Sequence, residues 1–185
     1  YQESLKTSGA MDFDDLLSKT EELFLTQPSA RFAEATRFDH LLIDEYQDTN
    51  RPQYLLIRRL AEIHRNLAVV GDPDQSIYKW RGADLRNILD FEHDFPDVSI
   101  IKLEQNYRST QIILSAANAV ITRNENRKPK NLWSTAGDGE QLIGYVADTE
   151  HDEAQFVAAE IKRLNEEGGH RYGDAAVFYR TNAQS

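Results

Sequence analysis

Residues 41–45 read Leu-Leu-Ile-Asp-Glu, and residues 67–72 read Leu-Ala-Val-Val-Gly-Asp. Short runs of leucine and β-branched residues are typical of buried strands in a parallel sheet. Each run ends in acidic residues, and open α/β sheets bind their ligands beyond the carboxyl ends of the strands. The two segments therefore predict neighbouring parallel strands whose polar ends share a ligand site.

The spacing of apolar residues elsewhere predicts helices. One helix is expected to open at Asp12 and end before Pro28, and others to cover residues 52–63, 85–95, 109–122 and 153–164, with Asp84 as an N-cap. Further strands are expected at 98–103, 142–147 and 175–179. Strand–helix–strand units of this length are typical of an α/β fold in which helices flank a parallel sheet.

Composition limits the class of protein. The 185 residues suffice for one sizeable domain or two small ones, and 40% hydrophobic residues indicate a folded chain. A formal charge of −10 argues against a surface coated with basic residues, although a local basic groove is compatible with it. The chain has no cysteine, no signal peptide and no stretch of membrane-spanning length, so the sequence predicts a soluble, cytoplasmic protein without disulfides.

Because the chain starts at Tyr1 without methionine and stops just after a predicted strand, we expect a piece of a longer protein.

Asp44 and Glu45 are adjacent at a strand end, so their side chains are expected to point in different directions. One can hold a hydrated Mg²⁺ while the other faces an attacking water, which is the division of labour that phosphoryl transfer needs. Two acids that merely solvate a loop are the simpler alternative. A metal-dependent nuclease or phosphatase is a third, and it would require these two carboxylates and those of Asp72 and Asp74 to converge on two ions about 4 Å apart.

The segment 71–82 combines an amide, aromatics and a cation. The amide of Gln75 is suited to sensing a terminal phosphate. Tyr78 and Trp80 can share one face of an extended segment beside Arg81, which makes a stacking platform for unpaired bases. Packing in the core is the usual role of such aromatics, but their polar neighbours favour exposure here.

Three other features leave alternatives open. Arg108 can reach a γ-phosphate across a cleft or simply lie on the surface beside a helix start. The basic residues between 123 and 130 are expected to form a solvated loop, with a phosphate-backbone contact as the alternative. The five histidines show no metal-ligand spacing.

Five ordered segments carry a family resemblance. They are Asp-Phe-Asp-Asp-Leu (12–16), Ile-Asp-Glu-Tyr-Gln-Asp-Thr-Asn (43–50), Val-Gly-Asp-Pro-Asp-Gln-Ser-Ile-Tyr-Lys-Trp-Arg-Gly-Ala-Asp (70–84), Leu-Glu-Gln-Asn-Tyr-Arg-Ser-Thr (103–110) and Tyr-Arg-Thr-Asn-Ala-Gln-Ser (179–185). In this order and spacing they resemble consecutive motifs of UvrD/PcrA/Rep-type superfamily 1 DNA helicases. The resemblance implies a parent that moves 3′ to 5′ along single-stranded DNA in repair or replication, using ATP and Mg²⁺.

The resemblance also implies a role for each matching position. On the ATP side, Asp44 would coordinate Mg²⁺, Glu45 would activate water, Gln75 would contact the γ-phosphate, Tyr107 would stack on adenine and Arg108 would be an arginine finger. On the DNA side, contacts with single strands and with junctions between single- and double-stranded DNA would come from Phe13, Tyr78, Trp80, Arg81, Arg180 and Asn182. No protein partner is implied.

The resemblance implies a fold made of parts of two RecA-like P-loop NTPase domains. Residues 1–10 would end an inserted helical subdomain, 11–105 would complete the first RecA-like domain, and 106–185 would begin the second. The sequence departs from the family in two respects. No Gly-x-x-x-x-Gly-Lys-[Ser/Thr] phosphate loop occurs between residues 1 and 185, and the family's second arginine finger and later motifs are also missing. We therefore expect this chain by itself to be inactive as an ATPase. A degenerate, non-catalytic module that binds DNA or protein remains the alternative.

Overall fold

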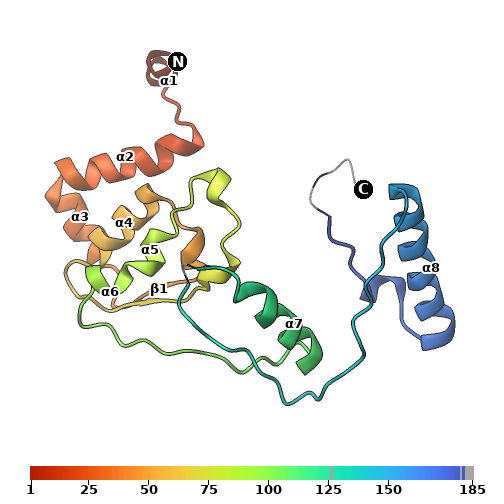
Figure 1. The fold of residues 1–185 in the computed structure, drawn as a ribbon. Coiled ribbons are helices and arrows are strands. Elements are labelled where there is room, and N and C mark those ends of the chain that lie inside the picture. Colours follow the sequence, from red (N-terminus) through yellow and green to blue (C-terminus); the bar gives the residue numbers. More distant parts are fainter. Residues whose placement is uncertain (126, 180, 182–185) are drawn as a thin grey trace. The chain divides into compact units, whose positions relative to one another are not determined.

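The computed structural model describes residues 1–125, 127–179 and 181 (Figure 1). The chain forms two compact units, residues 1–136 and 137–185. The first unit contains α1 (Gln2–Thr7), α2 (Phe13–Thr26), α3 (Pro28–Ala35), β1 (Leu41–Ile43), η1 (Tyr46–Asp48), α4 (Arg51–Ala61), β2 (Leu67–Val69), η2 (Pro73–Gln75), η3 (Lys79–Arg81), α5 (Arg86–Leu89), α6 (Phe91–Asp94) and α7 (Gln111–Ile121). The second contains α8 (Glu150–Gly168) and η4 (Tyr172–Asp174), where η denotes a 3₁₀ turn. The predicted boundary at 105/106 stays a prediction.

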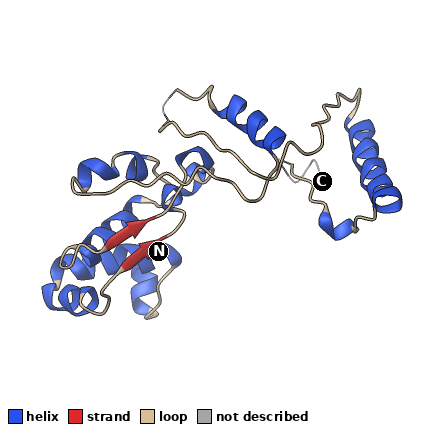
Figure 2. Ribbon diagram, turned by 90° about the horizontal axis from the view of Figure 1, so that it is seen from below, coloured by secondary structure: helices blue, strands red, loops and turns tan. Residues whose placement is uncertain are grey.

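The two strands pair in parallel, as the sequence predicted (Figure 2). Leu41 lies opposite Leu67, and Ile43 lies opposite Val69. Beyond the strands, the N–H of Val70 donates to the carbonyl of Ile43 at 2.8 Å, which keeps the two chains together up to their polar ends. The prediction of neighbouring parallel strands is therefore confirmed.

Helix α4 forms the crossover between the strands. Its start is a capping box, in which the side chains of Asn50 and Gln53 each accept from the other's backbone N–H, and Pro52 follows in the first turn. Its inward face contributes to the core, which consists of Tyr46, Tyr54, Ile57 and Phe91. The rings of Tyr46 and Phe91 meet edge to face with centroids 5.5 Å apart, a favourable aromatic geometry. This core covers one side of the short sheet.

The opposite side of the sheet is open in the described residues, which corrects the expectation of fully buried strands. Ile43, Leu67 and Val69 pack against the core, whereas Leu42 between them is 71% exposed. Successive side chains of a strand point to opposite faces of the sheet. When the core covers only one face, every second side chain of the strand is exposed to solvent. The strands are therefore half-buried.

The first predicted helix is confirmed, because α2 begins after its N-cap Asp12 and ends at Thr26, before Pro28. Pro28 itself begins a further helix, α3, because proline is well tolerated in the first turn, where its missing N–H is not needed. The prediction for residues 84–95, by contrast, needs correction. The helix expected over 85–95 is two short helices, α5 and α6, separated at Asp90. Asp84 is not the N-cap, a place taken by Leu85, although the Asp84 carboxylate accepts from the N–H of Arg86 at 3.1 Å.

The third predicted strand, 98–103, is not a strand in the structure. Ile101 and Leu103 in it are about four-fifths exposed, at 80% and 79%. The chain pairs only just beyond, where Gln105 forms an isolated parallel bridge with Trp133. A strand is stable only within a ladder, so an apolar run without a neighbouring strand stays a loop.

The second unit is built around α8. Thr149 caps its start by accepting from the N–H of Asp152, and Gly169 ends it in the left-handed conformation, with φ 68°, that glycine adopts without strain. The helix predicted over 153–164 is therefore confirmed, and it extends a few residues further at each end. The ring of Tyr145 stacks on that of Phe156 with centroids 4.0 Å apart. The strands expected at 142–147 and 175–179 carry no ladder in the described residues, so both predictions are wrong here.

Within the described residues, no helix is both long enough and apolar enough to cross a membrane.

Candidate functional site

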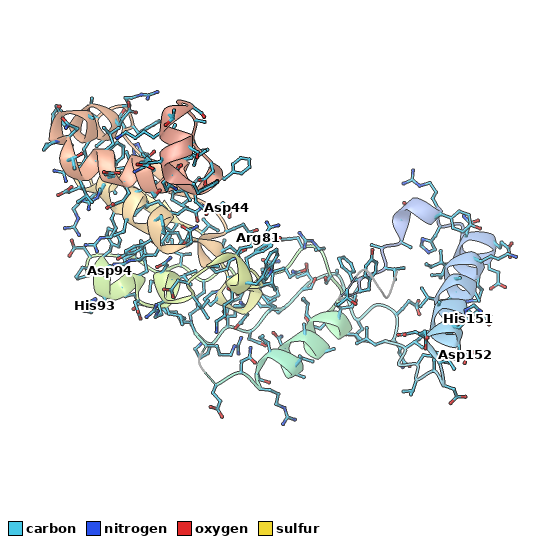
Figure 3. The ribbon with its side chains drawn as sticks, turned by 90° about the horizontal axis from the view of Figure 1, so that it is seen from above. Asp44, Arg81, His93, Asp94, His151 and Asp152 are labelled. Atoms are coloured by element: carbon cyan, nitrogen blue, oxygen red, sulfur yellow. The ribbon has the colours of Figure 1, made fainter. Side chains whose placement is uncertain are left out.

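The acidic pair follows β1 directly. Asp44 and Glu45 are both exposed, and the backbone N–H of Glu45 donates to the Asp44 carboxylate at 2.8 Å. Glu45 has a left-handed backbone, with φ 49° and ψ 42°, which costs a residue other than glycine about 1 kcal/mol. This conformation turns the chain from the strand into η1, and Figure 3 labels Asp44 at this strand end.

Gln47 connects the ends of the two strands. Its side-chain Nε2 donates to the Glu45 carboxylate at 2.7 Å, and its Oε1 accepts from the backbone N–H of Asp72 at 3.0 Å. The residue is only 1% exposed, so both hydrogen bonds are sheltered from water. Gln47 belongs to the motif at 43–50, but the sequence alone assigns it no bonding partner.

Gly71 allows this close approach. A Cβ atom at this position would lie 2.6 Å from Oε1 of Gln47 and 3.1 Å from the backbone nitrogen of Tyr46. The contact with Oε1 is closer than Cβ atoms come to other heavy atoms, so any larger residue would displace the Gln47 amide or separate the two strand ends.

Asp72 organises the turn that carries Gln75. Its carboxylate accepts from the N–H of Asp74 at 3.0 Å and from Nε2 of Gln75 at 2.7 Å. A continuous chain of hydrogen bonds thus runs from Glu45 through Gln47 and Asp72 to Gln75. The structure brings together these predicted residues from two strand ends.

Two basic residues of the loop that was predicted to be solvated form ion pairs with the turn at 72–75. Arg127 donates to Asp74 through Nη2 at 2.8 Å and through Nε at 3.3 Å, and both side chains are 10% exposed. Lys130 pairs with Asp74 at 3.0 Å and also with Asp72. The expectation of a solvated loop is wrong at these positions, because long-range ion pairing removes both side chains from water.

These pairs alter the acidity of Asp74. Burial by itself favours the neutral carboxyl group, but the hydrogen bonds from Arg127 and Lys130 favour the charged form more strongly and hold the pKa of Asp74 below its ordinary value. The charges of Asp72 and Asp74 are therefore already compensated by side chains. This pairing counts against the nuclease alternative, which needs the same two carboxylates free to bind metal ions.

The histidines give no alternative metal site. His93 lies 3.7 Å from Asp94, and His151 precedes Asp152 on α8 (Figure 3). Among the residues that the structure describes, no group of three histidine, cysteine or acidic side chains could hold a metal ion.

An exposed aromatic pair follows the turn. Trp80 is 75% and Tyr78 37% exposed, and their ring centroids are 6.5 Å apart. The guanidinium of Arg81 lies over both rings, at 4.6 Å from the Trp80 centroid and 5.3 Å from that of Tyr78. The predicted exposure is confirmed, but the segment is not extended: Trp80 lies in the 3₁₀ turn η3, and Tyr78 immediately precedes that turn.

The segment before α7 is organised locally. The Asn106 side chain accepts from the backbone N–H groups of Arg108 and Ser109, at 2.9 and 2.7 Å, which forms a tight turn. The exposed ring of Tyr107 carries a hydroxyl that donates to Gln105 at 2.9 Å. Tyr107 and Arg108 are both exposed, and among the described residues neither makes a hydrogen bond or ion pair with Glu45 or Gln75.

The remaining predicted DNA contacts are placed only in part. Phe13 is the first residue of α2 and is 89% exposed. Arg180 and Asn182 lie outside the described residues.

The chain matches two protein families. The UvrD/REP helicase N-terminal domain matches residues 1–96, and the UvrD-like helicase C-terminal domain matches residues 101–185. Similar curated proteins are the ATP-dependent DNA helicase UvrD1 of Mycobacterium tuberculosis, 55% identical over 192 residues, and the ATP-dependent DNA helicases PcrA of Leuconostoc citreum and Bacillus subtilis, 54% and 52% identical over 185 residues. Each match covers all of this chain but only 25% of the relative's length. The chain therefore belongs to the UvrD-like helicase family.

Proposed function

We propose that this chain supplies part of the ATP site and of the single-stranded DNA surface of an ATP-driven DNA helicase. The observation that carries the proposal is the hydrogen-bonded chain from Glu45 to Gln75, which joins a strained acidic strand end to an amide on a neighbouring turn. The names of the relatives support the same activity. The direction, 3′ to 5′, a role in repair or replication, and a cytoplasmic location are parts of the proposal that rest on family resemblance.

On the ATP side, Asp44 is the residue that would hold Mg²⁺. Its carboxylate is exposed and makes a local hydrogen bond to the N–H of Glu45. Magnesium commonly binds through one or two carboxylates together with waters and substrate phosphates, so a single exposed carboxylate fits it. The bound ion would neutralise charge on the phosphates of ATP.

Glu45 acts as the proton acceptor. Its carboxylate is exposed to solvent on one side and held by Gln47 on the other, so it can take a proton from a water molecule while keeping one orientation. Gln75 contacts the terminal phosphate by exchanging its hydrogen bond to Asp72 for one to a phosphate oxygen. Tyr107 stacks on adenine, and Arg108 stabilises negative charge on the transferred group.

On the DNA side, Tyr78 and Trp80 stack on bases while Arg81 contributes positive charge. Base stacking on an aromatic side chain is worth about 1–3 kcal/mol per base and tolerates any sequence. Phe13, Arg180 and Asn182 add further contacts along the strand. The substrates are single-stranded DNA and junctions between single- and double-stranded DNA.

The proposed architecture is RecA-like. Residues 11–105 belong to the first RecA-like domain and 106–185 to the second, after a helical segment at 1–10. Two features support this division: the parallel pairing of β1 with β2, and the change of matched family between residues 96 and 101.

A test compares ATP hydrolysis by the full-length protein that contains this chain, with and without single-stranded DNA. Glu45→Gln should reduce the DNA-stimulated rate by about 100-fold or more while nucleotide binding persists, because the proton acceptor is lost. Glu62→Gln, an exposed acid beyond the end of α4, is the matched control and should keep the rate. Undiminished hydrolysis by Glu45→Gln would reject the proposed role. Residues 1–185 alone, without a phosphate loop, should hydrolyse no ATP.

A further inference from the structure

Gln47 is held between the two strand ends with both ends of its amide in use. Only 1% of the residue is exposed, and its closest partners are the Glu45 carboxylate at 2.7 Å and the backbone N–H of Asp72 at 3.0 Å. Nε2 also donates weakly to the Asp48 carboxylate, at 3.5 Å. Burying an amide group is unfavourable unless hydrogen bonds replace those it made with water, so the hydrogen bonds of Gln47 are what make its burial possible.

The orientation of this amide follows from its partners. A backbone N–H can only donate, so the atom facing Asp72 must be the carbonyl oxygen Oε1. The NH₂ group is then directed at Glu45, where an ionised carboxylate is an ideal acceptor. The reverse orientation would place two donors together at Asp72 and two acceptors together at Glu45.

Length matters as well as polarity. The amide fills the space above Gly71, where even a Cβ atom would approach Oε1 to 2.6 Å. Asparagine is one methylene shorter and cannot reach both partners from the same backbone position. Methionine has the length of glutamine but neither donates nor accepts in this way.

Glu45 needs such a partner. Its side chain is exposed and so has little packing to hold it, while its backbone is strained in the left-handed region. The bond from Gln47 fixes one carboxylate oxygen, Oε2, and leaves the other for solvent. The same amide also accepts a hydrogen bond from the backbone N–H of Asp72, and the carboxylate of Asp72 accepts one from the side chain of Gln75.

We infer that Gln47 is a positioning residue that orients the Glu45 carboxylate and ties that orientation to the turn at 72–75. This inference rests on the proposed function of Glu45 as proton acceptor. If the turn at 72–75 moves, the N–H of Asp72 moves with it. The Gln47 amide that is hydrogen-bonded to this N–H then shifts, and the Glu45 carboxylate bonded to the amide changes its position. Through this link a change at Gln75 reaches the hydrolytic group without any direct contact between them.

The first variant is Gln47→Met in the full-length protein, which keeps the length of the side chain and removes both hydrogen bonds. We expect kcat for ATP hydrolysis to fall roughly 10- to 100-fold, because a misplaced proton acceptor reacts slowly, with little change in KM for ATP. A wild-type kcat in Gln47→Met would overturn the inference.

The second variant, Gln47→Glu, separates positioning from a purely structural role. When protonated, the introduced carboxyl group can accept from the N–H of Asp72 and donate to Glu45, as the amide does. When ionised, it faces the like charges of the Glu45 and Asp48 carboxylates. The rate relative to wild type should therefore rise as pH is lowered. A constant ratio across pH would contradict the inference. If Gln47→Met does not fold, the pH profile of Gln47→Glu by itself tests the inference.

Thr49→Val is the matched control. Thr49 lies just after η1, is 8% exposed, and donates to the carbonyl of Tyr46 at 2.7 Å, so the substitution weakens the same segment without touching Glu45. It should lower the midpoint of thermal unfolding but leave a constant rate ratio across pH.

Glu45→Gln, measured alongside, separates the two levels of the proposal. Full activity in Glu45→Gln overturns the assignment of Glu45, and the inference with it. An inactive Glu45→Gln beside a fully active Gln47→Met overturns the inference alone and leaves the proposed function standing.

Discussion

The guanidinium of Arg127 donates two hydrogen bonds to the Asp74 carboxylate, at 2.8 and 3.3 Å, across 53 residues of chain. Asp74 lies in the region that matches the N-terminal helicase family, and Arg127 in the region that matches the C-terminal one. Both side chains are largely withdrawn from water. This pair and its neighbour Lys130 therefore attach the segment after α7 to the turn that carries Gln75.

The stability losses from removing the two partners of this pair should not be additive. Arg127→Met leaves Asp74 buried with only Lys130 as a partner, and Asp74→Asn leaves Arg127 without its full countercharge. We expect each single variant to lower the midpoint of thermal unfolding by several degrees and the double variant to lose less than the sum. Circular dichroism melts of the four proteins test this. Strictly additive losses would show that the two side chains are not coupled.

The contribution of Asp74 should depend on pH in a defined direction. Its pKa in the folded protein lies below the ordinary value of 3.8, so its stabilising effect is present at pH values above 3.8 and is lost as pH falls through the lower, folded value. The stability difference between wild type and Asp74→Asn should therefore be constant near neutrality and shrink in the acid range, below about pH 4. Denaturant titrations at several pH values measure it. A difference that grows on acidification would refute this assignment.

Gly71 should tolerate no side chain. In Gly71→Ala the new Cβ would meet Gln47 at 2.6 Å and Ile88 at 2.9 Å, and relieving that overlap should cost about 2 kcal/mol of unfolding free energy. Gly144→Ala is the control, because a Cβ there meets nothing within 4 Å, so its effect should stay within about 0.5 kcal/mol. Equilibrium unfolding in urea compares the two. Equal stabilities would mean that the strand ends are not tightly packed.

The aromatic pair and the cation above it should contribute differently to DNA binding. Trp80→Ala should weaken binding of an oligonucleotide by about 1–3 kcal/mol and leave the salt dependence unchanged, because stacking releases no counterions. Arg81→Ala should weaken binding and also reduce the salt dependence. Phe32→Ala, an aromatic residue on α3 that is 60% exposed, is the control. Fluorescence anisotropy of a labelled single strand at several salt concentrations measures all three. Unchanged affinity in Trp80→Ala would remove Trp80 from the DNA surface.

Local features of this protein were predictable where neighbouring residues decide them. The N-terminus of α2 is a capping box between Asp12 and Asp15, and Gly169 ends α8; both signals lie within a few residues in the sequence. The parallel pairing of 41–43 with 67–69 was predictable from two apolar runs joined by a helical pattern. The strand predicted at 98–103 failed because apolar composition states only a preference, while a ladder requires a partner.

The sequence by itself determined which residues stand at the two strand ends, and hence the carboxylates, amide and aromatics that a ligand would meet. Only the tertiary structure decided their connections: the buried bridge of Gln47 from Glu45 to Asp72, and the ion pairs that bring Arg127 and Lys130 onto the turn at 72–75. The physical reason is range. Strand and helix preferences arise from covalent neighbours, whereas a buried hydrogen bond or ion pair depends on which distant segments exclude water together.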